Sequence, residues 1–182
     1  MAASPSIPPA PLPSTALDAE EIAELAYHRC GLRPDGEHGP GELLRRLFGP
    51  ASVELTSKVR PGRVVVEFSS TLGGAPVCVR MSDRQTPEED TIACAKACAI
   101  HEEWARSGSW TQDRWSQEFI EKVVAAIALP EGAARAAIDE GWTFTKIARH
   151  YVLDLGWVQT RIEALPEKPS LVMPVAPRAS ES

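Results

Sequence analysis

The spacing of hydrophobic and polar residues changes period twice along the chain. Before residue 50, apolar residues recur at helical spacing, and Gly31 and Gly49 supply stops, so we expect helices over residues 17–30 and 41–48. Three runs rich in β-branched residues follow and predict strands over residues 53–58, 63–68 and 76–81. The middle run is apolar on both faces, which is typical of a central, covered strand. We expect a small three-stranded antiparallel sheet.

A long helix is predicted next, over residues 86–106. Thr86, Pro87 and Glu89 have the form of a capping box with proline at the first helical position. Residues 92–100 are apolar on nearly every side except at Lys96, which is typical of a helix packed inside a core. Helices over 117–129 and 131–140 follow, Thr143 caps another that reaches Tyr151, and residues 156–165 close the ordered region. The predicted fold class is therefore α+β, with about six helices packed on the sheet.

Both ends of the chain are rich in proline. Residues 1–15 hold five prolines and residues 166–182 hold four, so we expect disordered tails around one domain that spans residues 16–165. The hydrophobic content of 43% is sufficient for a real core.

Net charge and hydropathy exclude several function classes. The formal charge of −6 argues against a protein that coats nucleic acid or an anionic membrane. No apolar run approaches the roughly 20 residues needed to span a bilayer, and no basic residue precedes an apolar segment at the N-terminus. We expect a cytoplasmic protein with no membrane partner.

The four cysteines form no CxxC pair, and the ordinary interpretation is reduced, buried thiols. Cys94, Cys98 and His101 fall along one helical face, which leaves a Cys/Cys/His metal site as an alternative. Aromatic residues cluster nearby, either as packing beneath a loop or as the lining of a ligand pocket. They are Trp104, Trp110, Trp115 and Phe119.

The pair His101-Glu102 is the main candidate for chemistry. A His-Glu pair on a buried helix is the first half of the zinc-protease motif HExxH, in which two histidines one turn apart hold the metal and the glutamate acts on the bound water. The position of the second histidine holds Ala105, which has no lone pair to donate. The other interpretation is a His and a Glu at the solvated end of a helix.

The order of these elements resembles the ImmA/IrrE family of zinc metallopeptidases over residues 16–165. Besides His101-Glu102, the helix over 117–129 resembles the family's second motif in its small apolar run and its terminal Leu129-Pro130. The stretch from Phe144 to Leu165 resembles the family's closing helix-turn-helix-like segment. The resemblance implies a zincin-like metallopeptidase fold, zinc as the cofactor and transcriptional repressors as partners.

Carried over by position, the resemblance makes His101 the first zinc ligand and Glu102 the catalytic base. The third ligand, a glutamate in the family, falls on Phe119, with Glu118 and Glu121 as the neighbouring carboxylates that could serve instead. A catalytic zinc ordinarily takes three protein ligands and a water. The resemblance therefore implies a degenerate site with zinc weakly held or absent.

Three functions follow from these observations. The first is a metallopeptidase-like regulatory protein that binds a partner such as a helix-turn-helix repressor. The second is an active zinc endopeptidase with atypical ligands that cleaves such a repressor. The third is a DNA-binding protein that uses residues 143–165, although the basic groups Lys146, Arg149, His150 and Arg161 are opposed by two carboxylates, which argues against nucleic acid as the partner.

Overall fold

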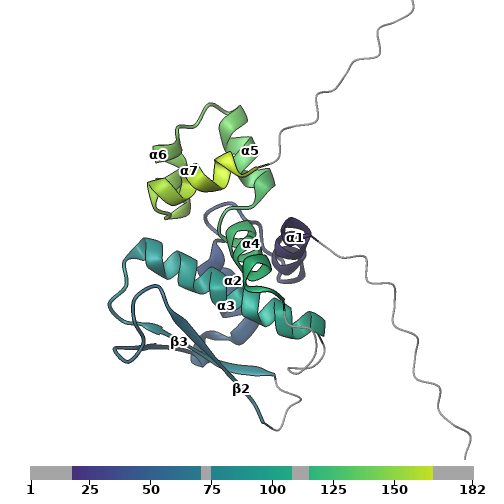
Figure 1. Cartoon of the computed structure of the whole chain (residues 1–182), viewed down its shortest axis with the longest axis vertical. Helices are drawn as coiled ribbons and strands as arrows, with labels where there is room; N and C mark the ends of the chain where they lie inside the picture. Colours follow the sequence, from purple (N-terminus) through teal and green to yellow (C-terminus); the bar gives the residue numbers. More distant parts are fainter. Residues whose placement is uncertain (1–17, 71–74, 108–114, 166–182) are drawn as a thin grey trace, which may run out of the picture.

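The computed structural model describes residues 18–70, 75–107 and 115–165. Within them the chain forms seven α-helices and a three-stranded sheet (Figure 1), which confirms the α+β class. The helices are α1 (Ala19–Arg29), α2 (Pro40–Phe48), α3 (Pro87–Ser107), α4 (Gln117–Ala128), α5 (Glu131–Asp139), α6 (Phe144–Tyr151) and α7 (Leu155–Glu163), and the strands are β1 (Val53–Thr56), β2 (Val64–Phe68) and β3 (Pro76–Ser82). The two predicted tails lie outside the described residues.

Capping side chains fix where the helices begin. The Thr86 hydroxyl accepts from the Glu89 backbone N–H at 3.2 Å, and the Glu89 carboxylate accepts from the Thr86 N–H at 2.9 Å. This reciprocal pair is the predicted capping box, and it satisfies two backbone donors at the start of α3. Asp18 and Glu21 form a second capping box at the start of α1.

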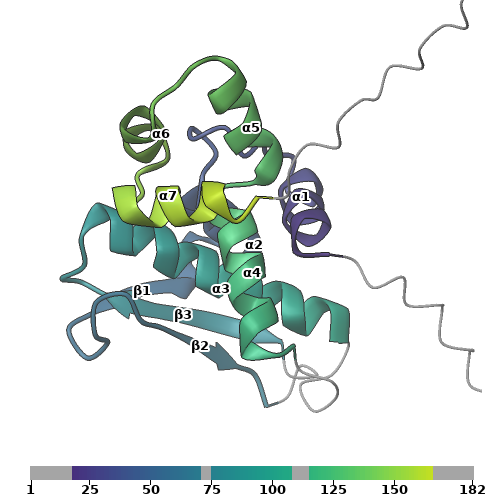
Figure 2. The same cartoon turned by 45° about the horizontal axis from the view of Figure 1, so that its top comes forward.

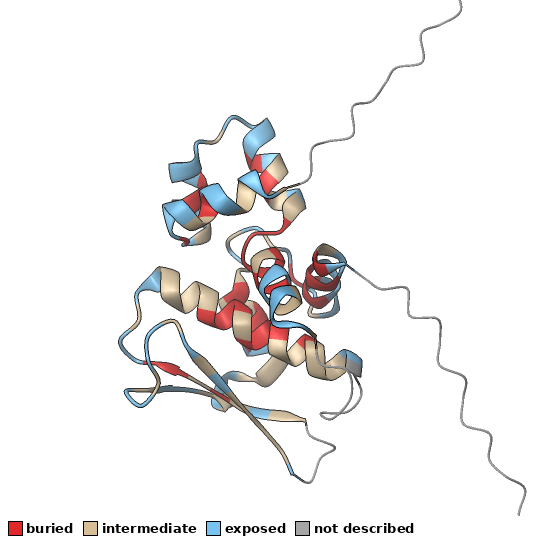
Figure 3. Ribbon diagram, in the orientation of Figure 1, coloured by how far each residue is buried: buried red, intermediate tan, exposed pale blue. Residues whose placement is uncertain are grey.

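Helix α3 lies at the centre of the molecule, between the sheet on one side and α1 and α4 on the other (Figures 1 and 2). The residues of its middle turns are small and buried, which allows neighbouring helices to approach closely (Figure 3). They are Ala93, Cys94, Ala95, Ala97, Cys98 and Ala99. Lys96 is only partly buried, and its ammonium donates to the Gly62 carbonyl at 3.0 Å. The prediction of a core helix is confirmed.

The sheet differs from the prediction in two respects. Its order is β1-β3-β2, with β2 antiparallel to β3 but β1 parallel to β3, so the sheet is mixed and not antiparallel. The central strand is β3, whereas β2 was expected there and lies at an edge with Val65 46% exposed. Strand β3 lies between β1 and β2, and its Val79 and Met81 are buried in the core beneath α3.

The last three helices form a lobe above α1 and α4 (Figure 1). Arg161 of α7 anchors it: the guanidinium pairs with Glu20 of α1 and donates to the Leu129 carbonyl at 3.1 Å. The other oxygen of Glu20 accepts from the Glu131 N–H at 2.9 Å, at the start of α5. His150 of α6 adds a hydrogen bond to the Asp35 carbonyl at 2.8 Å. Across the described ranges, no helix combines the length and the apolar character needed to cross a membrane.

Candidate functional site

The His101-Glu102 pair lies toward the carboxyl end of α3, inside the protein. The His101 side chain is 14% exposed and packs edge-on between the rings of Phe48 and Trp104, with ring centroids 5.2 and 5.8 Å away. The Glu102 side chain is completely buried. The pair therefore does not occupy a solvated helix end, which was the other interpretation of the dipeptide.

Arginines surround the buried carboxylate of Glu102. Its Oε2 atom lies 2.5 Å from Nη2 of Arg29, at the end of α1, and 3.7 Å from Nε of Arg106, one turn further along α3. Its Oε1 atom lies 3.6 Å from Nδ1 of His101, which is too long for a hydrogen bond. Burial raises the pKa of Glu102, but His101 and the Arg29 guanidinium lower it by more, so this pKa lies below its ordinary value. Glu102 is an ionised, charge-paired group.

This environment differs from that of a general base in hydrolysis. Such a base must reach a water that it can deprotonate, and its proton affinity must be sufficient to hold the proton. Glu102 has no exposed surface, and its strongest contact is with a guanidinium. Through the contact with Arg29, Glu102 joins α1 to α3.

The remaining positions of the expected zinc shell supply no ligands around His101. Ala105 presents a methyl group. Glu118 is 78% exposed and pairs with Lys122 at 2.7 Å, which lowers its pKa, and Glu121 is exposed and accepts from Gln117 at 3.2 Å. Phe119, at the third-ligand position, packs on Trp115 with ring centroids 5.1 Å apart.

The residues around His101 do not form a zinc site. Within residues 18–70, 75–107 and 115–165, no three His, Cys, Asp or Glu side chains gather so that they could hold a metal. A single imidazole beside an alanine and an arginine-paired carboxylate does not fit the donor set of a catalytic zinc.

All four cysteines are free thiols, and Cys94 and Cys98 are buried as predicted, whereas Cys30 and Cys78 are only partly buried. Burial and the nearby Asp90 carboxylate raise the pKa of Cys94 to about 12, and burial raises the pKa of Cys98 well above its ordinary value. Both thiols lie in the core, where Cys94 Sγ is 3.9 Å from the Asp90 carboxylate and Cys98 Sγ is 3.8 Å from the Pro40 carbonyl.

The aromatic residues near the end of α3 are part of the packing between α3 and α4. The rings of Trp115 and Phe119 meet edge to face, and the backbone N–H of Trp115 donates to the Glu103 carboxylate at 3.0 Å. Trp110 lies outside the described residues. The contacts of Trp115 and Phe119 fit the packing interpretation of the cluster.

The basic residues of α6 and α7 contact mainly other parts of the protein. Arg161 is 11% exposed and anchors the lobe, and His150 binds the Asp35 carbonyl. The Lys146 ammonium lies 3.9 Å above the Trp142 ring. Arg161 is the sole basic residue from Leu155 to Leu165, so the surface of α7 offers little to a phosphate backbone.

Two features of this region are invisible to sequence reasoning. The first is Arg29, the partner of Glu102 from 73 residues away, and the second is Glu20, which joins three helices. Each resembles an ordinary surface residue of an amphipathic helix, and no local signal could have identified either one.

Comparison of the chain with protein-family models, with curated proteins and with solved structures gave no match in any of the three.

Proposed function

We propose that this chain is a metallopeptidase-like regulatory protein of the ImmA/IrrE type, with a degenerate zinc site, that acts by binding a protein partner such as a helix-turn-helix repressor. The observation that carries the proposal is the pairing of Glu102 with Arg29 at 2.5 Å inside the core. The Arg29 guanidinium contacts one oxygen of the carboxylate, and the Glu102 side chain has no surface exposed to water. Ala105 stands at the position of the second zinc ligand and cannot bind a metal, which also supports a degenerate site.

The motif order on the α+β scaffold supports the relation to the metallopeptidases. The helix bearing His101-Glu102 packs on the three-stranded sheet, and α4 packs against that helix. Leu129-Pro130 follows α4 directly, and α5 and the helix pair α6 and α7 come next. An active peptidase with atypical ligands is the contrary hypothesis. DNA binding gains no support, because Arg161 is committed to Glu20 and Leu129.

Reconstruction of the zinc shell tests both halves of the proposal. The native chain, His101→Ala and the double variant Ala105→His/Phe119→Glu would be purified, and their zinc content measured by elemental mass spectrometry. We expect no stoichiometric zinc in the first two and about one zinc per chain in the double variant, which regains the three-ligand set. His28→Ala, which changes an exposed histidine of α1, is the matched control.

Each contrary outcome identifies which part of the proposal fails, the degenerate zinc site or the metallopeptidase-like scaffold. About one zinc in the native chain that disappears in His101→Ala, but not in His28→Ala, would establish an intact atypical site and a peptidase. A double variant that keeps its native circular-dichroism spectrum but binds no zinc would refute the metallopeptidase-like scaffold.

Partner binding is tested with the helix-turn-helix repressors encoded in the same genome. Each would be titrated with the native chain by calorimetry and then analysed by mass spectrometry for cleavage. We expect at least one repressor to bind and to remain intact. Cleavage of a bound repressor would support the peptidase, and failure of every repressor to bind would remove this class of partner.

A further inference from the structure

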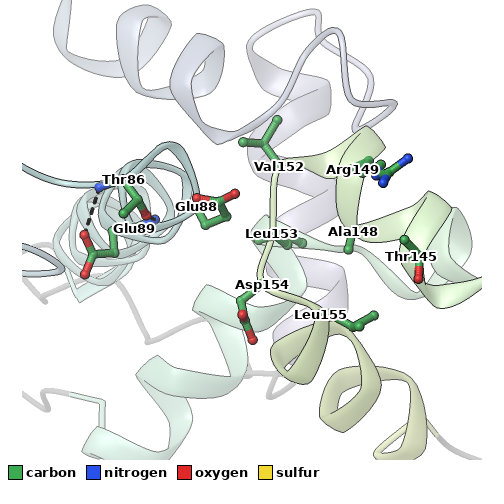
Figure 4. Close-up of a pocket in the computed structure, with 10 residues that line it drawn as sticks. All are labelled: Thr86, Glu88, Glu89, Thr145, Ala148, Arg149, Val152, Leu153, Asp154 and Leu155. Carbon is green, nitrogen blue, oxygen red and sulfur yellow. Dashed lines mark hydrogen bonds between the residues drawn. The ribbon is translucent and has the colours of Figure 1, made fainter.

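A cavity of about 660 Å³ opens between the first turn of α3 and the turn that joins α6 to α7 (Figure 4). We call it the α3/α7 groove. Two nearly buried apolar residues line it, Ala148 from α6 and Leu153 from the turn. Glu88 lines it from α3, and Val152 and Leu155 line it from the turn and the start of α7.

Val152 is unusual in both backbone and exposure. Its φ of 53° and ψ of 57° place it in the left-handed region, where it ends α6. A β-branched residue adopts this conformation at a cost, and glycine is the common residue at such a helix end. Val152 is nevertheless 41% exposed, as is Leu155. Two apolar side chains thus border the groove in contact with water, one of them at a position that disfavours it.

The charges around the groove are predominantly negative. The Glu88 side chain extends from α3 toward the turn (Figure 4), and its carboxylate forms no hydrogen bond or ion pair with any described residue. Asp154 and Glu89 are the other carboxylates, each holding a backbone N–H through a side-chain oxygen. Arg149, the one basic residue of the lining, lies across the turn from Glu88.

This combination selects one kind of occupant. Carboxylates repel the phosphates of nucleic acid and attract Lys and Arg. Apolar edges reward burial of Leu, Ile or Met side chains. A segment that carries both kinds of residue at helical spacing is a basic amphipathic helix, which binds by placing its apolar face in a groove.

We propose that the α3/α7 groove docks a basic amphipathic segment of the protein partner. Apolar side chains of that segment pack on Val152 and Leu155, and its Lys or Arg side chains pair with Glu88 and Asp154. This inference rests on the proposed function, because it presumes a protein partner, and it identifies the surface and the chemistry of that partner.

The test uses a labelled synthetic helix of about four turns, with Leu on one face and Lys on the other. Fluorescence anisotropy would measure its affinity for the full chain and for Glu88→Lys and Val152→Gly, and Glu24→Lys, at an exposed site on α1, is the control for net charge. We expect affinity to fall by about tenfold or more in the first two variants and to change little in Glu24→Lys. Val152→Gly should melt no lower than the native chain, so its effect will not reflect unfolding.

If Glu88→Lys and Glu24→Lys lose affinity for the peptide equally and Val152→Gly loses none, the binding is general charge attraction. That outcome would overturn the proposal. Amide chemical shifts provide a second measurement: residues 86–89 and 145–155 should move on addition of the peptide, and movements confined to other regions would refute the groove.

A repressor that binds the native chain allows the groove and the proposed function to be tested separately. If it binds Glu88→Lys and Val152→Gly as tightly as the native chain, the groove is wrong and the proposed function stands. If the peptide occupies the groove and no repressor binds, the groove stands and the assigned partner class is wrong.

Discussion

At the scale of single residues, the ion pair between Arg29 and Glu102 is the most consequential contact in the candidate site. Glu102 is completely buried, whereas the Arg29 side chain is 49% exposed. Loss of one partner of a fully buried pair costs about 3–5 kcal/mol. For Arg29→Ala we expect about 2 kcal/mol, because the arginine is half exposed and Arg106 stays nearby.

The loss in Arg29→Ala should depend on pH. The pKa of Glu102 is lowered in the folded protein, so the stabilisation is present above the pKa of the unfolded chain and disappears as pH falls through the folded value. Urea unfolding from neutral pH down to about pH 3 should show the two proteins converging. Arg45→Ala, which removes a surface pair with Glu42, should change little at any pH. A pH-independent loss in Arg29→Ala would show that packing, and not charge, holds Glu102.

At the scale of secondary-structure elements, one polar cluster attaches the α5–α7 lobe to the core. Arg161 binds both Glu20 of α1 and the carbonyl at the end of α4, and Glu20 also holds the first N–H of α5. His150 adds a second polar contact, to the Asp35 carbonyl, and apolar residues of α5–α7 belong to the same hydrophobic core as those of α1 and α4. We expect the Arg161–Glu20 cluster to limit how often the lobe opens.

Arg161→Ala should open the lobe without unfolding the core. The variant removes the guanidinium from one oxygen of Glu20 and from the Leu129 carbonyl, at a cost of about 2 kcal/mol, or roughly thirtyfold in the opening equilibrium. Hydrogen exchange resolved by residue should show faster exchange in α5–α7 and unchanged exchange in the middle of α3. Arg149→Ala, at an exposed arginine on the same lobe, is the control. Equal acceleration in α3 would mean that the lobe and the core unfold together.

At the scale of the whole molecule, stability comes from the packing around α3. Buried alanines and cysteines of α3 bring α2 and α4 close, and the Tyr27 hydroxyl of α1 donates to the Ile127 carbonyl of α4 at 3.1 Å within this core. The buried charge of Glu102 is neutralised by arginine. These contacts hold α1, α2 and α4 around α3.

Metal removal should therefore leave the melting temperature unchanged. Thermal unfolding followed by circular dichroism, before and after dialysis against EDTA, tests this expectation. A ligand that binds only the folded state raises its stability by mass action. A fall of several degrees on chelation, restored by added zinc, would contradict the proposed degenerate site.

The sequence by itself determined the elements of this fold. Thr86 and Glu89 define the start of α3, glycines and prolines mark helix ends, and the small apolar run of α3 identified the core helix, because caps and periodicity act between residues that are close in the chain. The pair His101-Glu102 was likewise recognised from adjacent residues, as the first half of an HExxH motif.

Only the tertiary structure decided the pairing of those elements. The parallel contact between β1 and β3 and the edge position of β2 depend on which strand fills the space under α3. The partnerships of Arg29 with Glu102 and of Arg161 with Glu20 join residues 73 and 141 positions apart. A charged residue on an amphipathic helix has the same local pattern whether it faces water or a buried carboxylate. The packing of distant helices decides between these environments, and with it the difference between a catalytic glutamate and a structural one.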